Sequence, residues 1–447
     1  MTLVSSGPTS HVVTRPTGAP GLGDRPMTSF HLVLAAGGAL LLIGLIMVFS
    51  ATSVDSLQEN GSVYASFGTQ VTFAGFGLVA FWIALRMRPT LLRRLAGPGM
   101  LIALLLLVLV LIPGIGQEYN EARRWFEIGP LSLQPSELAK VAFVVWGADL
   151  LVRKRKLIDR WPHLLVPLVP AGVLLGVLVL MQPNLGTALV FFLILFSLLW
   201  SVGAPARLFV TMGTALVAAV VVMIAAEPYR AARLTGFLDP FADPDGATLQ
   251  AANGLYALAT GGWWGVGLGN SRMKWGLLPE QDSDFIFAII GEELGFAGCL
   301  LVLALYGLLA YAGIRVARRT NDGFIRLAAA AITVWLIGQA LINVGYVVGL
   351  LPITGLPLPL ISSGGTSLIL TMFAVGILAN FARHEPAAVS YLKRRRRTWW
   401  ARAAAPVPHS AGSERRQPRV RTTPGSRAGA APRVRGRTSG QPRGTRR

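Results

Sequence analysis

The chain has 447 residues, of which 53% are apolar and only 14% are charged, with a mean hydropathy of +0.56. This composition excludes an ordinary water-soluble globular protein and indicates a polytopic membrane protein. The formal charge of +20 is concentrated near the C-terminus, because the stretch from Arg383 onward has 18 Lys and Arg against two acids and so carries +16 of it. The single cysteine, Cys299, excludes an intramolecular disulfide and a cysteine metal site.

Apolar runs of about 20 residues, long enough to cross a bilayer, occur in ten places. They lie at roughly 30–51, 66–86, 91–112, 136–152, 162–181, 184–202, 206–226, 284–314, 324–350 and 366–383. The sequence therefore predicts an all-α polytopic integral membrane protein with about ten transmembrane helices. A large outer loop, 227–283, is expected between spans seven and eight. The flanking segments 1–29 and 386–447 are rich in Pro, Gly, Ser, Thr or Arg, and we expect them to be disordered around a membrane domain at 30–385.

The basic loops predict the orientation. With ten spans, the arginines at 86–94, the RKRK run at 153–156 and the arginines at 315–319 fall on the same side as both termini. Basic loops mark the cytoplasmic side of a membrane protein. We therefore expect a multi-pass protein of the cytoplasmic membrane with both termini in the cytoplasm and most of its acids outside.

One acidic turn leads directly into a long apolar helix, in the stretch LLPEQDSDFIFAIIGEELGFAG at 277–298. An ionisable group at the mouth of a membrane span indicates function, because lipid does not solvate charge. None of the five histidines falls on the outer side in this topology, which leaves carboxylates as candidates for a base. Asp284 is the first candidate, and its alternative role is to cap the helix N-terminus. Glu292 and Glu293 lie one to two turns further in.

Another outer stretch, at 122–140, brings arginines next to a tryptophan and then opens a helix at Ser136. Glu137 and Lys140 share a helix face at i, i+3. Lys140 is a candidate counter-ion for Glu292 or Glu293, since an unpaired buried charge would be costly. The alternative for this stretch is a belt of interfacial aromatic residues followed by an N-capped helix.

The remaining outer stretches supply cations and irregular backbone. The glycine-rich segment before Glu280 lacks a P-loop ending, so we expect neither nucleotide nor nucleic acid as a partner. The Pro/Gly-rich segment at 349–367 is predicted to be re-entrant, which requires surrounding protein or a water-filled cavity. The candidate substrate-binding residues in these stretches are Arg124, Arg230, Arg233, Arg272, Lys274, Glu280, Ser362 and Ser363. The same cations suit phospholipid head groups as an alternative.

Five motifs together resemble the SEDS family (shape, elongation, division and sporulation), and within it the cell-division branch more than the elongation branch. They are QPSELAK at 134–140, FLDPFADP at 237–244, GVGLGNSRMKWGLLPE at 265–280, DFIFAIIGEELG at 284–295 and LLPITGLPLPLISSGGTS at 350–367. The resemblance covers about residues 30–385. One departure is Asn184, where the family usually has an aspartate.

The resemblance implies an inverting peptidoglycan glycosyltransferase that polymerises lipid II into β-1,4 glycan on the outer membrane face at the division septum. It implies Asp284 as the base, with the outward cations on the pyrophosphate. No tightly bound cofactor is expected, although a divalent cation, Mg²⁺ or Mn²⁺, can share the work on the pyrophosphate. The implied partners are lipid II, a class B penicillin-binding protein transpeptidase and other division proteins. A lipid II flippase and a non-catalytic scaffold are the alternatives.

Overall fold

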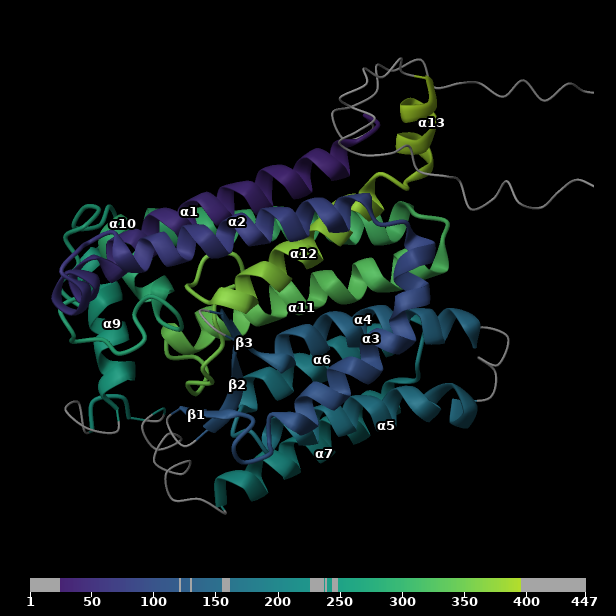
Figure 1. Ribbon diagram of the computed structural model, residues 1–447, viewed down its shortest axis with the longest axis horizontal. Helices are drawn as coiled ribbons and strands as arrows, with labels where there is room; N and C mark the ends of the chain where they lie inside the picture. Colours follow the sequence, from purple (N-terminus) through teal and green to yellow (C-terminus); the bar gives the residue numbers. More distant parts are fainter. Residues whose placement is uncertain are drawn as a thin grey trace, which may run out of the picture. The chain divides into compact units, whose positions relative to one another are not determined.

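A computed structural model describes residues 25–119, 122–128, 131–154, 161–225, 237, 239–242 and 248–394, which belong to a single structural unit. The described part is a bundle of long helices with one small sheet (Figure 1). Its strands are β1 (Gln117–Tyr119), β2 (Ala122–Ile128) and β3 (Leu131–Leu133). Its helices are α1 (Thr28–Asn60), α2 (Ala65–Arg86), α3 (Pro89–Leu109), α4 (Pro135–Arg153), α5 (Trp161–Leu180), α6 (Leu185–Ser201), α7 (Ala206–Ala225), α9 (Leu249–Gly261), α10 (Ile286–Arg319), α11 (Gly323–Val347), α12 (Gly365–Ala382) and α13 (Pro386–Arg394).

Each predicted span coincides with a long helix. Among the described helices, six are long and apolar enough to cross a membrane, namely α1, α2, α3, α10, α11 and α12. The others are shorter or more polar: α6 has 17 residues, and α4 carries Glu137, Lys140 and Asp149. The structure therefore supports a multi-span bundle, while the count of ten spans and the position of the outer loop stay predictions.

Two groups of helices pack on α11. On one side α2 packs against α12 and α1, α1 packs against α10, and α10 packs against α11. On the other side α11 contacts α4 and α6, which in turn contact α3 and α5. Figure 1 shows α1, α2, α12 and α11 running alongside one another, with α3 to α7 on the other side of α11. Buried residues from both groups form one continuous hydrophobic core.

The bundle has two distinct ends. Gln281, just before α10, donates from Nε2 to Asp55 Oδ2 near the end of α1 at 2.8 Å. Arg315, near the end of α10, donates from Nε to Ser29 Oγ at the start of α1 at 2.9 Å. We call the first the Asp284 end and the second the opposite end. The connection between α2 and α3 lies at the opposite end, because α2 begins after the end of α1 and runs back along it.

A small antiparallel sheet corrects the all-α prediction. Strands β1, β2 and β3 form a meander between α3 and α4, with Gln117 opposite Trp125 and Phe126 opposite Leu133. The sequence ARRWFEI contains aromatic and charged residues that suit a half-buried strand better than a loop. Sequence analysis had treated this stretch only as the approach to a helix.

The helix α13 corrects the predicted start of the disordered C-terminal segment at residue 386. Ala388 and Leu392 on one face of α13 pack against Met27 and Phe30 at the start of the chain's described part. Beside them, burial raises the pKa of the Glu385 carboxyl, against the lowering effect of Ser29 and the arginines at 315 and 319. The remainder of the predicted tail, from residue 395, and the predicted segment 1–24 lie outside the described residues.

Two truncations test this boundary. Ending the chain after Arg394 keeps α13, whereas ending it after Pro386 removes the buried Ala388 and Leu392. Burying one leucine side chain is worth roughly 1.5–3 kcal/mol. We expect the shorter protein to melt at a lower temperature in detergent than the protein that ends at Arg394. The protein that ends at Arg394 should have the same melting temperature as the full chain. Equal melting temperatures for the two truncations would contradict the packing role of α13.

Candidate active site

A turn in front of α10 holds Asp284. The turn starts at Glu280, whose backbone is left-handed (φ 56°) and whose carbonyl accepts the N–H groups of Ser283 and Phe285 at 3.3 and 3.0 Å. Phe285, and not Asp284, occupies the N-cap position of α10. Asp284 therefore lies just outside the helix and is half-buried.

The backbone of Asp284 is fixed by two side chains of α11. Asn343 donates from Nδ2 to the carbonyl of Asp284 at 2.8 Å, and the Tyr346 hydroxyl lies 2.9 Å from the same oxygen. Asn343 also donates from Nδ2 to the carbonyl of Leu356 at 2.7 Å, and the Tyr346 hydroxyl, which has one hydrogen to donate, lies 2.8 Å from that oxygen. Because Asn343 and Tyr346 are themselves buried, the aspartate is attached to a rigid helix and not to a mobile loop.

The Pro/Gly-rich segment 348–364 forms the other wall of this turn. Ser362 donates to the carbonyl of Ser283 at 2.5 Å, and Ser363 donates from its hydroxyl to Asp282 Oδ2 at 2.6 Å. The two serines predicted to bind substrate therefore bind the turn that carries Asp284. Gly355 is left-handed (φ 66°), and a Cβ there would lie 3.3 Å from Asp284 Oδ2, so this glycine leaves room for the carboxylate.

The predicted cations have different environments. Arg124, on β2, donates to the carbonyls of Gln182 and Pro183 at 2.8 and 2.6 Å, so it ties the sheet to the turn between α5 and α6. Lys274 is buried and donates to the carbonyl of Gly269. Arg272 has an exposed side chain, and its backbone N–H donates to Glu292. The other two predicted cations, Arg230 and Arg233, lie outside the described residues.

The helix α10 breaks at Gly295, and a glycine-rich loop fills the break. Gly295 has φ 69° and ψ −170°, a conformation that is essentially restricted to glycine. The N–H groups of Val266 and Gly267 donate to the carbonyls of Glu292 and Glu293 at 2.9 and 3.1 Å. In return, Phe296 and Ala297 donate to the carbonyls of residues 262 and 263 at 2.9 and 3.2 Å. The loop thus satisfies the backbone groups that the break leaves open.

The carboxylates of Glu292 and Glu293 hold the same loop from the side. Glu292 accepts the Ser271 hydroxyl at 2.5 Å and the Arg272 N–H at 2.9 Å. Glu293 accepts the Ser50 hydroxyl at 2.7 and 2.8 Å and the Ser271 N–H at 3.3 Å. Both carboxylates are buried. Their role is to join α1 and the glycine-rich loop to α10.

Lys140 is not the counter-ion of Glu292 or Glu293, which corrects the prediction. Its Nζ lies 2.7 Å from Glu137 Oε1 and 3.1 Å from Gln339 Oε1, and 5.2 Å from the centre of the Trp335 ring. The prediction that Glu137 and Lys140 share a helix face is confirmed by their ion pair. The pair is almost completely buried between α4 and α11, where a charge without its partner would be strongly destabilising.

Among the described residues, several buried polar side-chain atoms have no hydrogen-bond partner. They are Ser136 Oγ, Glu137 Oε2, Thr354 Oγ1, Asn343 Oδ1 and both side-chain atoms of Gln182. Buried polar groups are normally hydrogen-bonded to protein or to ordered water. These buried atoms are therefore suited to bind water or a polar ligand, while the predicted re-entrant course of the segment 348–364 stays a prediction.

The residues that position Asp284, namely Asn343 and Tyr346, were not predicted. Together with Gln339, which contacts Lys140, they are polar residues at helical spacing within the apolar run of α11, and this pattern could have identified them. Asn184 caps α6 by accepting the N–H of Thr187 at 3.1 Å, which an aspartate would also do. Within the described residues, no group of three or more His, Cys, Asp or Glu could hold a metal ion.

Replacing Gly295 with alanine tests the break in α10. A Cβ at this position would lie 2.4 Å from the nitrogen of Gly265 and 2.6 Å from Trp263 backbone, so the substitution should destabilise the protein by at least about 3 kcal/mol. Gly307→Ala, in the same helix, is the matched control, because a Cβ added at Gly307 would have no neighbouring atom within 4 Å. In detergent, the Gly295→Ala variant should have a clearly lower melting temperature than the Gly307→Ala variant. Similar melting temperatures would contradict the close packing of the glycine-rich loop against the break at Gly295.

The buried ion pair predicts a different pattern of stability. Lys140→Met leaves Glu137 buried without its partner and should destabilise the protein by roughly 3–5 kcal/mol. Adding Glu137→Gln removes the remaining charge, and most of the lost stability should return. Melting temperatures of the two single variants and the double variant check this. A double variant that is as unstable as Lys140→Met would show that the pair does not act as a unit.

Comparisons with known proteins agree with this architecture. The model of the family described as "Cell cycle protein" (FtsW, RodA and SpoVE) matches residues 30–387. A relative from Mycobacterium tuberculosis, named probable peptidoglycan glycosyltransferase FtsW, is 48% identical over 369 residues, which are 83% of this chain and 70% of the relative. Stage V sporulation protein E of Bacillus subtilis is 39% identical over 77% of this chain and 94% of its own length.

Solved structures give the same result. A chain in a structure titled "Structural coordination of polymerization and crosslinking by a peptidoglycan synthase complex" superposes with a TM-score of 0.67, at 29% identity over 79% of this chain and 97% of that chain. The rod shape determining protein RodA of Thermus thermophilus superposes with a TM-score of 0.58, at 28% identity over 79% and 96% of the two chains. The family match, the identities and the shared fold confirm the resemblance found in the motifs: the chain belongs to the FtsW, RodA and SpoVE family of cell cycle proteins, the SEDS family.

Proposed function

We propose that this protein is a peptidoglycan glycosyltransferase that polymerises lipid II on the outer face of the cytoplasmic membrane during cell division. Relatives at 48% identity carry the name peptidoglycan glycosyltransferase, which supports the enzyme class. The multi-span bundle supports a substrate that reaches the enzyme from the membrane. The septal location and the orientation with both termini in the cytoplasm rest on the basic loops and the cell-division relatives.

The observation that carries the proposal is the placement of Asp284. Its carbonyl is held by Asn343 and Tyr346, and its half-buried carboxylate lies over Gly355 at the mouth of α10. A general base must be held within hydrogen-bond reach of the proton that it takes. A carboxylate on such a rigid support meets this condition with little loss of conformational entropy on binding.

The reaction joins two sugars with inversion at the anomeric carbon. Asp284 removes the proton from the 4-hydroxyl of the acceptor sugar as that oxygen attacks the anomeric carbon of the donor. The bond from this carbon to the pyrophosphate oxygen breaks, and the lipid pyrophosphate leaves with its electron pair. An inverting transfer needs only this one base, with positive charge or hydrogen-bond donors at the leaving group.

The leaving pyrophosphate needs cations near the turn. Arg272 is the best candidate among the described residues, because its side chain is exposed while its backbone is fixed by Glu292. Arg230 and Arg233 remain candidates from the sequence. Arg124, by contrast, is used at least in part to hold the turn between α5 and α6. A divalent cation bound to the pyrophosphate could share this work.

The proposed partners follow from the same family. One solved neighbour is part of a peptidoglycan synthase complex whose title names both polymerization and crosslinking. We extend this to a class B penicillin-binding protein transpeptidase and to other division proteins as partners of this chain.

A lipid II flippase would need polar groups along the whole depth of the membrane. In α4, by contrast, the apolar run 141–148 separates the Glu137–Lys140 pair from Asp149, which favours the polymerase.

The substitution Asp284→Asn tests the proposal. Asparagine keeps the size of the side chain and removes its ability to take a proton. A general base contributes a factor of about 10²–10⁴ in rate, so polymerisation of purified lipid II should fall by that factor while melting temperature and partner binding stay unchanged. The measurement is gel separation of the glycan strands made by the purified protein with its transpeptidase partner.

Asp282→Asn is the matched control for this experiment. Its side chain accepts the Ser363 hydroxyl, and an amide oxygen can accept the same hydrogen bond. It should therefore keep most of the activity. Near-native polymerisation by Asp284→Asn would show that Asp284 is not the base. An unaltered protein that transports lipid II and never polymerises it would favour the flippase, and one that does neither would favour the scaffold.

A further inference from the structure

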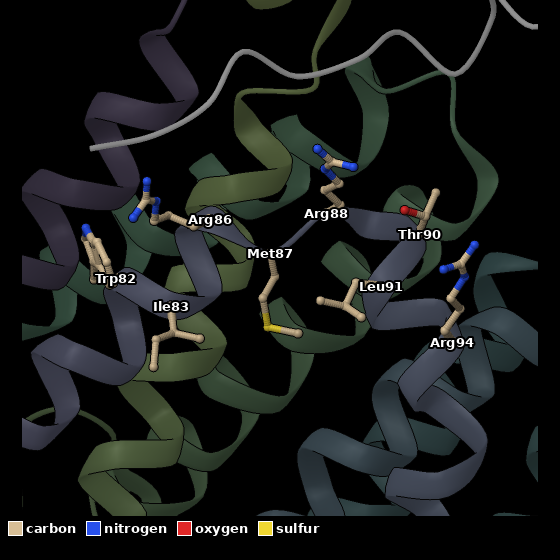
Figure 2. A pocket seen from close by; sticks show the side chains of 8 residues that line it. All are labelled: Trp82, Ile83, Arg86, Met87, Arg88, Thr90, Leu91 and Arg94. Atoms are coloured by element: carbon tan, nitrogen blue, oxygen red, sulfur yellow. The ribbon is translucent and has the colours of Figure 1, made fainter. Parts of the chain in front are cut away.

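A groove with three arginines on its rim lies at the opposite end of the bundle from Asp284. It has a volume of about 620 Å³ and lies where α2 passes into α3. Figure 2 shows Arg86, Arg88 and Arg94 around its upper edge, with Met87 and Leu91 pointing into the space between the two helices. At 1.5 Å per residue, the 22 residues of α2 separate this groove from the Asp284 end by about 33 Å.

The groove exists because two consecutive helices diverge. Only Met87 and Arg88 connect α2 to α3, yet α2 packs against α12 and α1, whereas α3 packs against α4 and α5. The side chains of Trp82, Ile83 and Leu91 are 46%, 45% and 43% exposed along the groove. Both helices are long and apolar enough to cross a membrane, so the groove opens at the boundary between hydrocarbon and water.

Among the described residues, the three arginines have no acidic partner, unlike Arg93 and Arg153 nearby. Arg93 and Arg153 both contact Asp149, at 2.7 and 2.6 Å. Within the described part of the chain, Arg86, Arg88 and Arg94 contact no carboxylate, and no Asp or Glu lines the groove. Arg86 is instead positioned by Trp82, with its guanidinium carbon 4.5 Å from the ring centre. This arrangement is a concentrated positive charge next to an apolar surface.

We propose that this groove binds the head group and upper acyl chains of an anionic phospholipid. A phosphate attached to acyl chains matches both parts of the site, since the arginines suit the phosphate oxygens and the apolar floor suits the chains. A free phosphate would contact only the arginines and leave the apolar floor uncovered. The positively charged group of a zwitterionic lipid would be repelled by the three arginines. The lipid fills the space between diverging helices and holds their connection in place. The site is separate from Asp284 and does not depend on the proposed enzyme activity.

Photo-crosslinking of the full-length protein in detergent tests this site. A phosphatidylglycerol with a diazirine near the head group is titrated, and labelled peptides from 82–94 are quantified by mass spectrometry. Each arginine near an anionic lipid is worth about a factor of five in affinity. Replacing Arg86, Arg88 and Arg94 together with glutamine should therefore raise the half-saturating concentration about 100-fold. Unlabelled phosphatidylglycerol should compete, whereas phosphatidylcholine and glycerol phosphate should not.

Two further variants make the result specific. Replacing Arg207, Arg318 and Arg326 with glutamine removes the same charge from exposed positions elsewhere and should leave the labelling of 82–94 within about twofold of the unaltered protein. Lysine at 86, 88 and 94 keeps the charge and should retain most of the binding, which separates charge loss from misfolding. Equal loss in the matched control, or equal competition by phosphatidylcholine or by glycerol phosphate, would overturn the proposal.

Discussion

The break in α10 at Gly295 is the feature on which the Asp284 end depends. Inside a membrane, backbone N–H and C=O groups without partners are costly, so a helix can be interrupted only where other protein groups replace its hydrogen bonds. Here the glycine-rich loop supplies them in both directions, and the carboxylates of Glu292 and Glu293 add contacts from serine hydroxyls and N–H groups. Glu292 and Glu293 thus serve to attach an irregular loop to a helix.

Asp284 lies between this attachment and a second one. Asn343 and Tyr346 on α11 hold its carbonyl, and the segment 348–364 holds the preceding turn through Ser362 and Ser363. Around it, buried polar atoms without protein partners indicate an interior that can accept water or polar ligand groups. The site therefore combines a rigidly supported carboxylate with buried polar atoms that can bind water or polar ligand groups, and both properties suit the proposed transfer between sugars whose lipid chains remain in the membrane.

The sequence predicted the helices well, because long apolar runs have few alternatives in a membrane. It also placed Asp284 at the start of a long helix and Glu137 and Lys140 on one helix face, since both depend on local spacing. Contacts between distant segments were not predictable from spacing: Lys140 was assigned to the wrong carboxylates, and the partners of Ser362 and Ser363 were unknown. The sheet at 117–133 was missed because its strands are short, and α13 was missed because its apolar face covers only one or two turns.

The most direct test of the central claim, that Asp284 acts on the acceptor sugar, is a structure of the protein with two lipid II molecules bound. A slow variant such as Asp284→Asn would trap them. The proposed mechanism requires the acceptor 4-hydroxyl to lie within hydrogen-bond distance, about 2.6–3.2 Å, of the side chain at position 284. The donor's pyrophosphate should lie on the far side of its anomeric carbon. Substrate sugars bound away from residue 284, with another carboxylate at the acceptor hydroxyl, would contradict the mechanism.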